Sequence, residues 1–156
     1  DHYNHIEVAK YAKTLRDNGV RVLIGAHGQR EGLAAHWEMW MMAQGGFTPW
    51  EALRGATYDG AIALGMDKDL GSIEAGKLAD IVIIEEDVLS DIRKSEFVSH
   101  TMINGRLFDA KTMNEVVTGD YKAKPLFFDR LNINAMPTAT ATELKQKEEK
   151  YHWTHH

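Results

Sequence analysis

The stretch Gly45–Thr57 reads GGFTPWEALRGAT, and it is the most informative part of the chain. Thr48 can cap a helix and Pro49 suits the first helical position. Glu51 lies three residues after Thr48, so the two residues can form a capping box, in which each side chain bonds the other residue's backbone amide. Small and apolar residues continue downstream until a glycine follows Leu64. We therefore expect one helix that begins at this box and runs to about Leu64.

The sequence after this helix predicts a small antiparallel sheet. Leu70–Val82 reads LGSIEAGKLADIV, in which a turn-rich part leads into a β-branched strand at Asp80–Ile84. Two further strands, His100–Ile103 and Arg106–Phe108, flank an Asn-Gly pair that favours a type I′ hairpin turn. Two polar residues of this region are expected to be structural. Asp80 would accept turn hydrogen bonds, and Lys77 would be a turn or surface residue.

The sequence before Gly45 predicts a helix, a strand, a polar loop and a second helix. Residues Asn4–Asn18 carry an apolar stripe at three- and four-residue steps, which is typical of an amphipathic helix. Val20–Ile24 is almost continuously apolar, as in a strand that is buried on both faces of a parallel sheet. The loop Gly25–Gly32 is rich in glycine and polar residues. Leu33–Gln44 then predicts the second helix.

Composition narrows the classes of function. The 156 residues are 44% hydrophobic, which is enough for one compact core or two small lobes. The net charge of -5 comes with mixed acids and bases and no basic stripe, so a nucleic-acid partner is not expected. Cysteine is absent, which excludes disulfides and thiolate metal sites. No apolar run approaches the roughly 20 residues of a membrane span. Because the chain begins at Asp1 without a Met, we expect a fragment or a processed subunit.

The two quoted stretches together resemble the C-terminal signature of the amidohydrolase superfamily. In that signature a helix of the type G-x-T-P-x-E-A-L-x-x-A-T leads into L-G-S-I-E-x-G-K-x-A-D-x-V, and a later strand pair carries V-x-x-N-G. The resemblance runs from about residue 20 to about residue 110. It points to enzymes of the imidazolonepropionase and prolidase kind, and to a subset in which a Tol-type β-propeller precedes the barrel.

The resemblance implies an α/β fold. Residues 1–66 would supply the last strand and helices of a distorted (β/α)8 TIM barrel, with Val20–Ile24 as the eighth strand. Residues 67–112 would form the C-terminal part of a small β-sandwich that both chain ends build. Residues 113–156 would be a C-terminal extension. The active sites of such barrels lie at the C-terminal ends of the strands, so the loop after Ile24 should line the active site.

His27 is the main candidate for a catalytic residue and a metal contact. The family's eighth strand usually ends in a G-T-D-like sequence, whose Asp binds metal and deprotonates water. Here the corresponding residues are Gly25-Ala26-His27. An imidazole can bind Zn²⁺ or a similar divalent ion, and it can also transfer protons near neutral pH. A polar loop histidine without such a role is the alternative, and the loss of the Asp puts the standard mechanism in doubt.

Three further residues are candidates for substrate binding. Gln29 and Arg30 lie in the same loop and could bind polar groups or a carboxylate. His36 lies on the helix that follows, on one face with Trp40, and could reach the barrel mouth or be a satisfied, half-buried histidine. Glu38 is expected on the helix surface or as a carboxylate that supports the site. We assign no role to the histidines near the two chain ends, because such tails often bind metals adventitiously.

The sequence therefore predicts part of a metal-dependent hydrolase that cleaves an amide, cyclic amide or peptide-like C–N bond of a small molecule or peptide. Most metal ligands would lie outside this chain, so the chain alone should be inactive, expose apolar surface and aggregate. Its partners would be the rest of the barrel, a β-propeller and further copies in an oligomer. The subset favours a periplasmic or secreted protein. A non-catalytic scaffold of the same fold is the main alternative, and a dehydratase, deaminase or isomerase is another.

Overall fold

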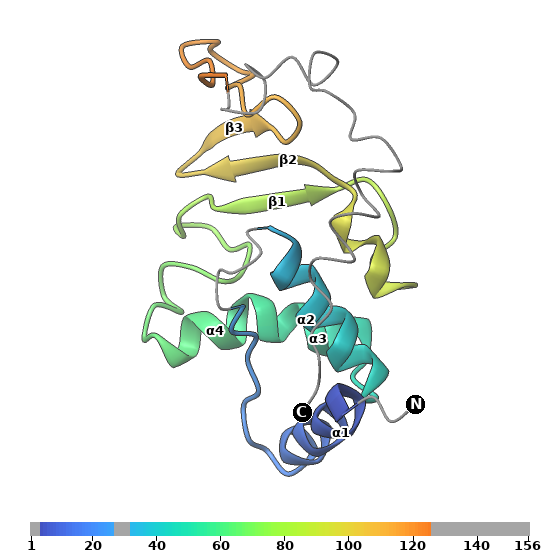
Figure 1. The fold of residues 1–156 in the computed structure, drawn as a ribbon. Coiled ribbons are helices and arrows are strands. Elements are labelled where there is room, and N and C mark those ends of the chain that lie inside the picture. The colour runs from blue at the N-terminus through green and yellow to red at the C-terminus, as the bar shows by residue number, and fades with distance from the viewer. Residues whose placement is uncertain (1–3, 27–31, 126–156) are drawn as a thin grey trace, which may run out of the picture. The chain divides into compact units, whose positions relative to one another are not determined.

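A computed structural model describes residues 4–26 and 32–125 (Figure 1). The chain divides into two compact units, residues 1–123 and 124–156, so nearly all described residues belong to the first unit. The sequence-based boundary between residues 66 and 67 stays a prediction. None of the helices in the described residues combines the length and the apolar character that crossing a bilayer requires.

Two helices of the first unit, α1 and α2, form where the sequence predicts them. α1 spans Asn4–Asp17, and α2 spans Leu33–Gln44. They contact each other, and Ala9 of α1 is buried. The chain also passes close to α1 at Gly45, directly after α2, where an added Cβ would lie 2.4 Å from the carbonyl carbon of Ala9. A glycine is therefore required there for the chain to pass this close to α1.

The predicted capping box is confirmed. The Thr48 hydroxyl oxygen accepts a hydrogen bond from the Glu51 amide at 3.2 Å, and the Glu51 carboxylate accepts one from the Thr48 amide at 2.8 Å. The helix that follows, α3, spans Pro49–Ala56. The box satisfies two amides that the first turn of a helix otherwise leaves unpaired, which explains why this helix begins where it does.

The prediction of one continuous helix to about Leu64 was wrong, because α3 ends at Ala56 and a short helix, α4, spans Tyr58–Ala63. Thr57 separates the two helices, with φ −132° and ψ −95°, which lie outside the helical region. Its hydroxyl donates to the Leu53 carbonyl at 2.8 Å. The break puts the carboxylate of Asp59, on α4, against the guanidinium groups of α1 and α3, a tertiary contact that helix periodicity does not encode.

The antiparallel sheet has three strands in the order β1–β2–β3, side by side in Figure 1. β1 spans Ile81–Ile84, β2 spans Val98–Ile103 and β3 spans Arg106–Asp109. A 3-10 helix, η1, spans Ile92–Glu96. The hairpin between β2 and β3 has Asn104 and Gly105 at φ 47° and 79°, as a type I′ turn requires. The hairpin is thus confirmed, while the β-sandwich around this sheet stays a prediction.

Lys77 and Asp80 hold the turns before β1. The Lys77 ammonium donates to the Asp67 carbonyl at 2.6 Å and to the Ser72 hydroxyl at 2.5 Å, and its side chain is only 9% exposed. Lys77 is therefore a structural turn residue rather than a surface one. The Asp80 carboxylate accepts a hydrogen bond from the Asn104 amide at 2.7 Å, which ties β1 to the hairpin turn. The structural role predicted for Asp80 is confirmed.

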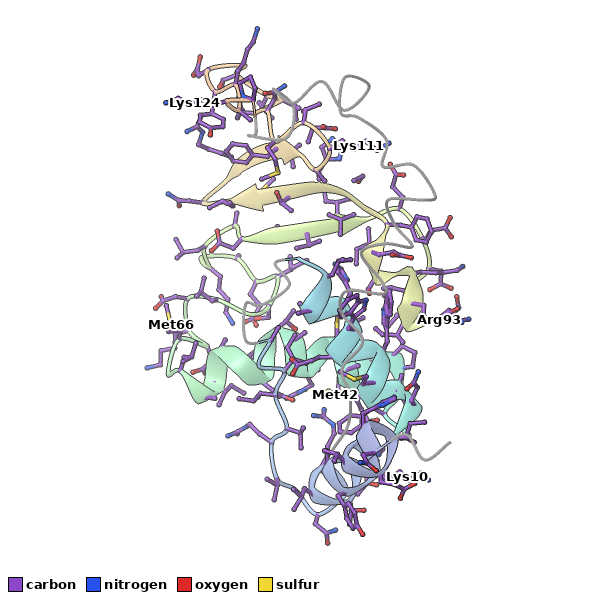
Figure 2. All side chains as sticks on the ribbon, viewed as in Figure 1. Lys10, Met42, Met66, Arg93, Lys111 and Lys124 are labelled. Carbon is purple, nitrogen blue, oxygen red and sulfur yellow. The ribbon has the colours of Figure 1, made fainter. Side chains whose placement is uncertain are left out.

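A small core joins α2, α3 and η1. Met39, Ala52 and Ile92 are buried together, and partly buried residues such as Met42 pack around them (Figure 2). Elsewhere the described residues leave large apolar side chains exposed. Val8, Tyr11 and Leu15 of α1, which follow one another at three- and four-residue steps, are 66%, 73% and 52% exposed. Exposed apolar surface of this extent agrees with the expectation for part of a barrel.

The strand predicted at Val20–Ile24 is not present in the structure. Residues 20–26 are described but belong to no helix or strand. The prediction rested on an apolar run that suits a strand with neighbours on both sides. The three strands of the described residues all form the separate antiparallel sheet, so this segment has no adjacent strand to pair with. Its apolar character alone does not make it a strand.

Candidate functional site

The loop Gly25–Gly32, which carries His27, is the candidate loop, and the segment that leads into it is held by α2 and α3. The Ile24 amide donates to the Gly55 carbonyl of α3 at 3.5 Å, and the Gly25 amide donates to the Glu38 carboxylate of α2 at 2.7 Å. At Gly55 an added Cβ would lie 3.0 Å from the Val22 carbonyl oxygen, so a glycine permits this approach. The backbone just before the loop is therefore placed by side chain and backbone groups of two helices.

Three of the four predicted site residues lie outside the described residues. These are His27, Gln29 and Arg30. The last described residues before them are Gly25 and Ala26, and the chain is described again from Gly32. The predicted roles of these three residues stay predictions.

His36, the fourth predicted residue, is half-buried in the first part of α2 and faces η1. Its Nδ1 lies 2.9 Å from the hydroxyl oxygen of Ser95, which is 1% exposed. The Trp40 indole donates to the same oxygen at 3.0 Å and to the Ile92 carbonyl at 3.0 Å. An indole N–H can only donate, so the Ser95 oxygen accepts it and is left with one proton of its own to donate. Donation of that proton to Nδ1 would leave the ring hydrogen of a neutral His36 on Nε2.

Glu38 points to a different side of α2 from His36. Residues two positions apart on an α-helix, such as these, are separated by about 200° of rotation, since each residue turns by about 100°. His36 accordingly contacts η1, whereas Glu38 contacts the end of the Val20–Ile24 segment. The structure therefore places Glu38, and not His36, against the backbone that leads into the candidate loop. The sequence alone predicts at most a supporting role for Glu38, because helical spacing does not show which neighbour each face of a helix contacts.

The described residues do not by themselves fit a metal ion. Within residues 4–26 and 32–125, no three His, Asp or Glu side chains come close enough together to hold one. His5 is one of the histidines near the start of the chain, and its Nε2 lies 2.8 Å from the side-chain oxygen of Gln44. His2 and the histidines at the C-terminal end lie outside the described residues. A metal centre would need ligands from outside the described residues.

A buried ion-pair cluster lies on the side of α3 that meets α1. The Asp59 carboxylate is 3% exposed and accepts hydrogen bonds from Arg54 at 2.8 Å and from Arg16 at 3.1 Å. Burial raises the pKa of this carboxyl, but the two arginine hydrogen bonds together lower it by more, so the pKa lies below its ordinary value. The Arg54 guanidinium also lies between the rings of Trp50 and Tyr58, 5.3 and 5.1 Å from their centroids.

The described residues form two pockets, and neither is lined by residues next to the candidate loop. One, of about 270 Å³, is bordered by this cluster, including Arg16 and Trp50. The other, of about 510 Å³, has walls that are mainly apolar and include Leu53, Ile73 and Val82. Neither is lined by Gly25, Glu38 or His36, so neither is the predicted site.

Comparison with known proteins identifies the family of this chain. The family model called "Amidohydrolase family" matches residues 1–108, which is more than half of the chain. The chain belongs to the amidohydrolase family. The resemblance that the sequence suggested is thus confirmed at the level of the family.

Individual relatives of this amidohydrolase chain are much longer than the matched parts. An imidazolonepropionase of Symbiobacterium thermophilum is 54% identical over 39 residues, which are 25% of this chain and 9% of that relative. An ochratoxinase of Aspergillus niger is 31% identical over 94 residues, which are 58% of this chain and 20% of that relative. The chain therefore spans a fifth or less of these curated relatives.

A solved structure supports the fold. A Xaa-Pro dipeptidase with methionine bound in its active site has a TM-score of 0.60 and 28% sequence identity, covering 67% of this chain and 25% of the dipeptidase chain. The similar solved structures are barrel enzymes of the amidohydrolase type. This chain corresponds to a small α/β part of such an enzyme.

Proposed function

We propose that the complete protein is a metal-dependent amidohydrolase that cleaves an amide, cyclic amide or peptide-like C–N bond. The observation that carries this proposal is the family match over residues 1–108, together with relatives that are named imidazolonepropionase and Xaa-Pro dipeptidase. The amidohydrolase family is generally metal-dependent. The ion, Zn²⁺ or a similar divalent one, would take its ligands from parts of the protein outside the described residues.

His27 is the residue of this chain that we propose for the chemistry. It would contact the metal or accept the proton of the attacking water, since an imidazole near neutral pH suits either role. Gln29 and Arg30 would bind polar or carboxylate groups of the substrate. We also retain His36 as a substrate-binding proposal, through its Nε2, because its Nδ1 is engaged by Ser95.

The wider assembly is part of the same proposal. The rest of the barrel, in the same or a separate chain, would complete the site and cover apolar side chains such as those exposed on α1. A β-propeller ahead of the barrel, an oligomeric state, a periplasmic or secreted location and a small-molecule or peptide substrate come from the sequence resemblance alone.

One observation favours a second candidate function. The residue that follows Gly25-Ala26 is His27, where the family's usual pattern has an Asp. A barrel that had lost this Asp could serve as a non-catalytic scaffold or binding subunit.

Hydrolysis by the wild-type complete protein separates the two candidates, because a scaffold would not hydrolyse an amide, and replacing His27 by alanine then tests the role of His27. We expect hydrolysis to fall by about a hundredfold or more, the scale of a lost general base, and metal content to fall if His27 is a ligand. His100→Ala is a matched control, because His100 lies on β2 and bonds the Ser99 hydroxyl, and it should hydrolyse like the wild type. Wild-type hydrolysis and metal content in His27→Ala would remove His27 from the proposed mechanism.

A further inference from the structure

We propose that Glu38 is a positioning residue for the reaction, which acts by holding the Gly25 amide and so fixes where the candidate loop begins. This inference rests on the proposed hydrolytic function and adds a residue to it. The decisive contact is the 2.7 Å hydrogen bond from the Gly25 amide to the Glu38 carboxylate.

Among the described residues, the Gly25 amide and the Glu38 carboxylate form no other hydrogen bond: each bonds only the other. A carboxylate that accepts an amide hydrogen bond makes a charge-assisted contact, stronger than one between neutral groups. The segment 20–26 is part of no sheet in the described residues, so no strand ladder formed by those residues fixes the Gly25 amide. His27 follows Gly25 by two positions in the sequence. The contact therefore acts on the backbone immediately ahead of the proposed catalytic residue.

Glu38 can fix this backbone because its own helix is held on other faces. Met39 is buried in the core with Ala52 and Ile92. Trp40 bonds the Ile92 carbonyl and the buried Ser95 hydroxyl, both on η1. These contacts leave α2 little freedom to follow the loop. The Glu38 side chain therefore ties the Gly25 amide to the core, next to the bond from the Ile24 amide to the Gly55 carbonyl of α3.

The contact is also well suited to a clean test. Glu38 forms no ion pair within the described residues, and its carboxylate bonds the Gly25 amide alone there. Removing the carboxylate should therefore release this amide without breaking a charge network. A glutamine at the same position keeps an oxygen that can accept the hydrogen bond, so it should preserve the contact at the cost of the charge.

The experiment compares Glu38→Ala and Glu38→Gln in the complete protein by hydrolysis kinetics and by amide hydrogen exchange. In Glu38→Ala we expect kcat to fall roughly tenfold to a hundredfold, the effect of misplacing a reacting group by about 1 Å, with little change in KM. Exchange should become faster in the peptide that contains Gly25 and not in peptides from β2. Glu38→Gln should restore most of both. Glu7→Ala, at an exposed Glu that pairs with Lys10 on α1, should match the wild type.

Several outcomes would overturn the proposal. Wild-type kcat and exchange in Glu38→Ala would show that the contact does not position the loop. Faster exchange with unchanged kcat would show that Glu38 holds the segment without serving the reaction. A uniform loss of protection and of thermal stability in both variants, without rescue by glutamine, would indicate a merely structural role. If the wild type hydrolyses no amide, the proposed function fails, and the exchange measurement still decides whether Glu38 anchors Gly25.

Discussion

Replacing Gly45 by alanine is expected to destabilise the folded protein by about 1–3 kcal/mol, the usual cost of forcing extra volume into a packed interior. The added Cβ would lie 2.4 Å from both the carbonyl carbon and the Cβ of Ala9 on α1. Backbone atoms cannot move aside as the end of a flexible side chain can, so α1 or α2 must shift. Thermal or denaturant unfolding of the complete protein measures the loss.

Gly60→Ala is the matched control for this substitution. Gly60 lies inside α4, and the nearest atom to an added Cβ there is the Gly55 carbonyl oxygen at 3.9 Å. Because alanine favours helix over glycine by about 1 kcal/mol, this variant should be as stable as the wild type or more stable. Equal stability of Gly45→Ala and the wild type would contradict the close packing of α1 against the end of α2.

Removing the Asp59 carboxylate is expected to be the second large effect, with Asp59→Ala losing about 3 kcal/mol of stability. Breaking a buried ion pair costs about 3–5 kcal/mol where the remaining charge is left without its partner. The low end applies here, because Arg54 is partly exposed and Arg16 keeps an ion pair with Glu51 at 3.5 Å. Asp59 joins three helices, since it lies on α4 and bonds Arg16 of α1 and Arg54 of α3. The free energy of unfolding at neutral pH measures this effect.

The exposed pair between Glu7 and Lys10 provides the contrast. Both side chains are more than half exposed, so Glu7→Ala should cost less than about 1 kcal/mol. A similar cost for Glu7→Ala and Asp59→Ala would show that burial of the cluster contributes nothing.

Low pH should weaken the ion pairs that Asp59 forms with Arg16 and Arg54. The pKa of Asp59 is lower in the folded state than its ordinary value, because the arginine hydrogen bonds outweigh the effect of burial. A carboxyl with a depressed folded pKa contributes stability that is complete above its unfolded pKa of about 4 and is lost as the pH falls through the folded pKa. The stability of the wild type should therefore fall in this acidic range, and that of Asp59→Ala should fall less.

The sequence predicted the elements whose signals are local. The box at Thr48 and Glu51 marks the beginning of α3, and the Asn104-Gly105 pair marks the hairpin, because both depend on residues only a few positions apart. Apolar spacing likewise predicted α1. The family signature agreed with these elements, and the match over residues 1–108 confirmed it.

The features that sequence did not predict depend on distant contacts. The break at Thr57 accompanies the pairing of Asp59 with Arg16, which is 43 residues away in the chain. The segment 20–26 forms no strand in the structure, because a strand needs hydrogen-bonded neighbouring strands, which the sequence of the segment itself does not determine. The contact of Glu38 with Gly25 depends on how α2 is rotated, and no motif records that rotation.

The most direct test of the central claim is hydrolysis by the complete protein before and after metal removal. The substrates would be a panel of Xaa-Pro dipeptides, other N-acyl amides and cyclic amides, assayed with the purified protein, after chelation and after Zn²⁺ is restored. We expect cleavage of at least one C–N bond, its loss on chelation and its return with the metal. A folded, complete protein that cleaves none of these bonds with metal supplied would contradict the proposed hydrolase function and favour a scaffold.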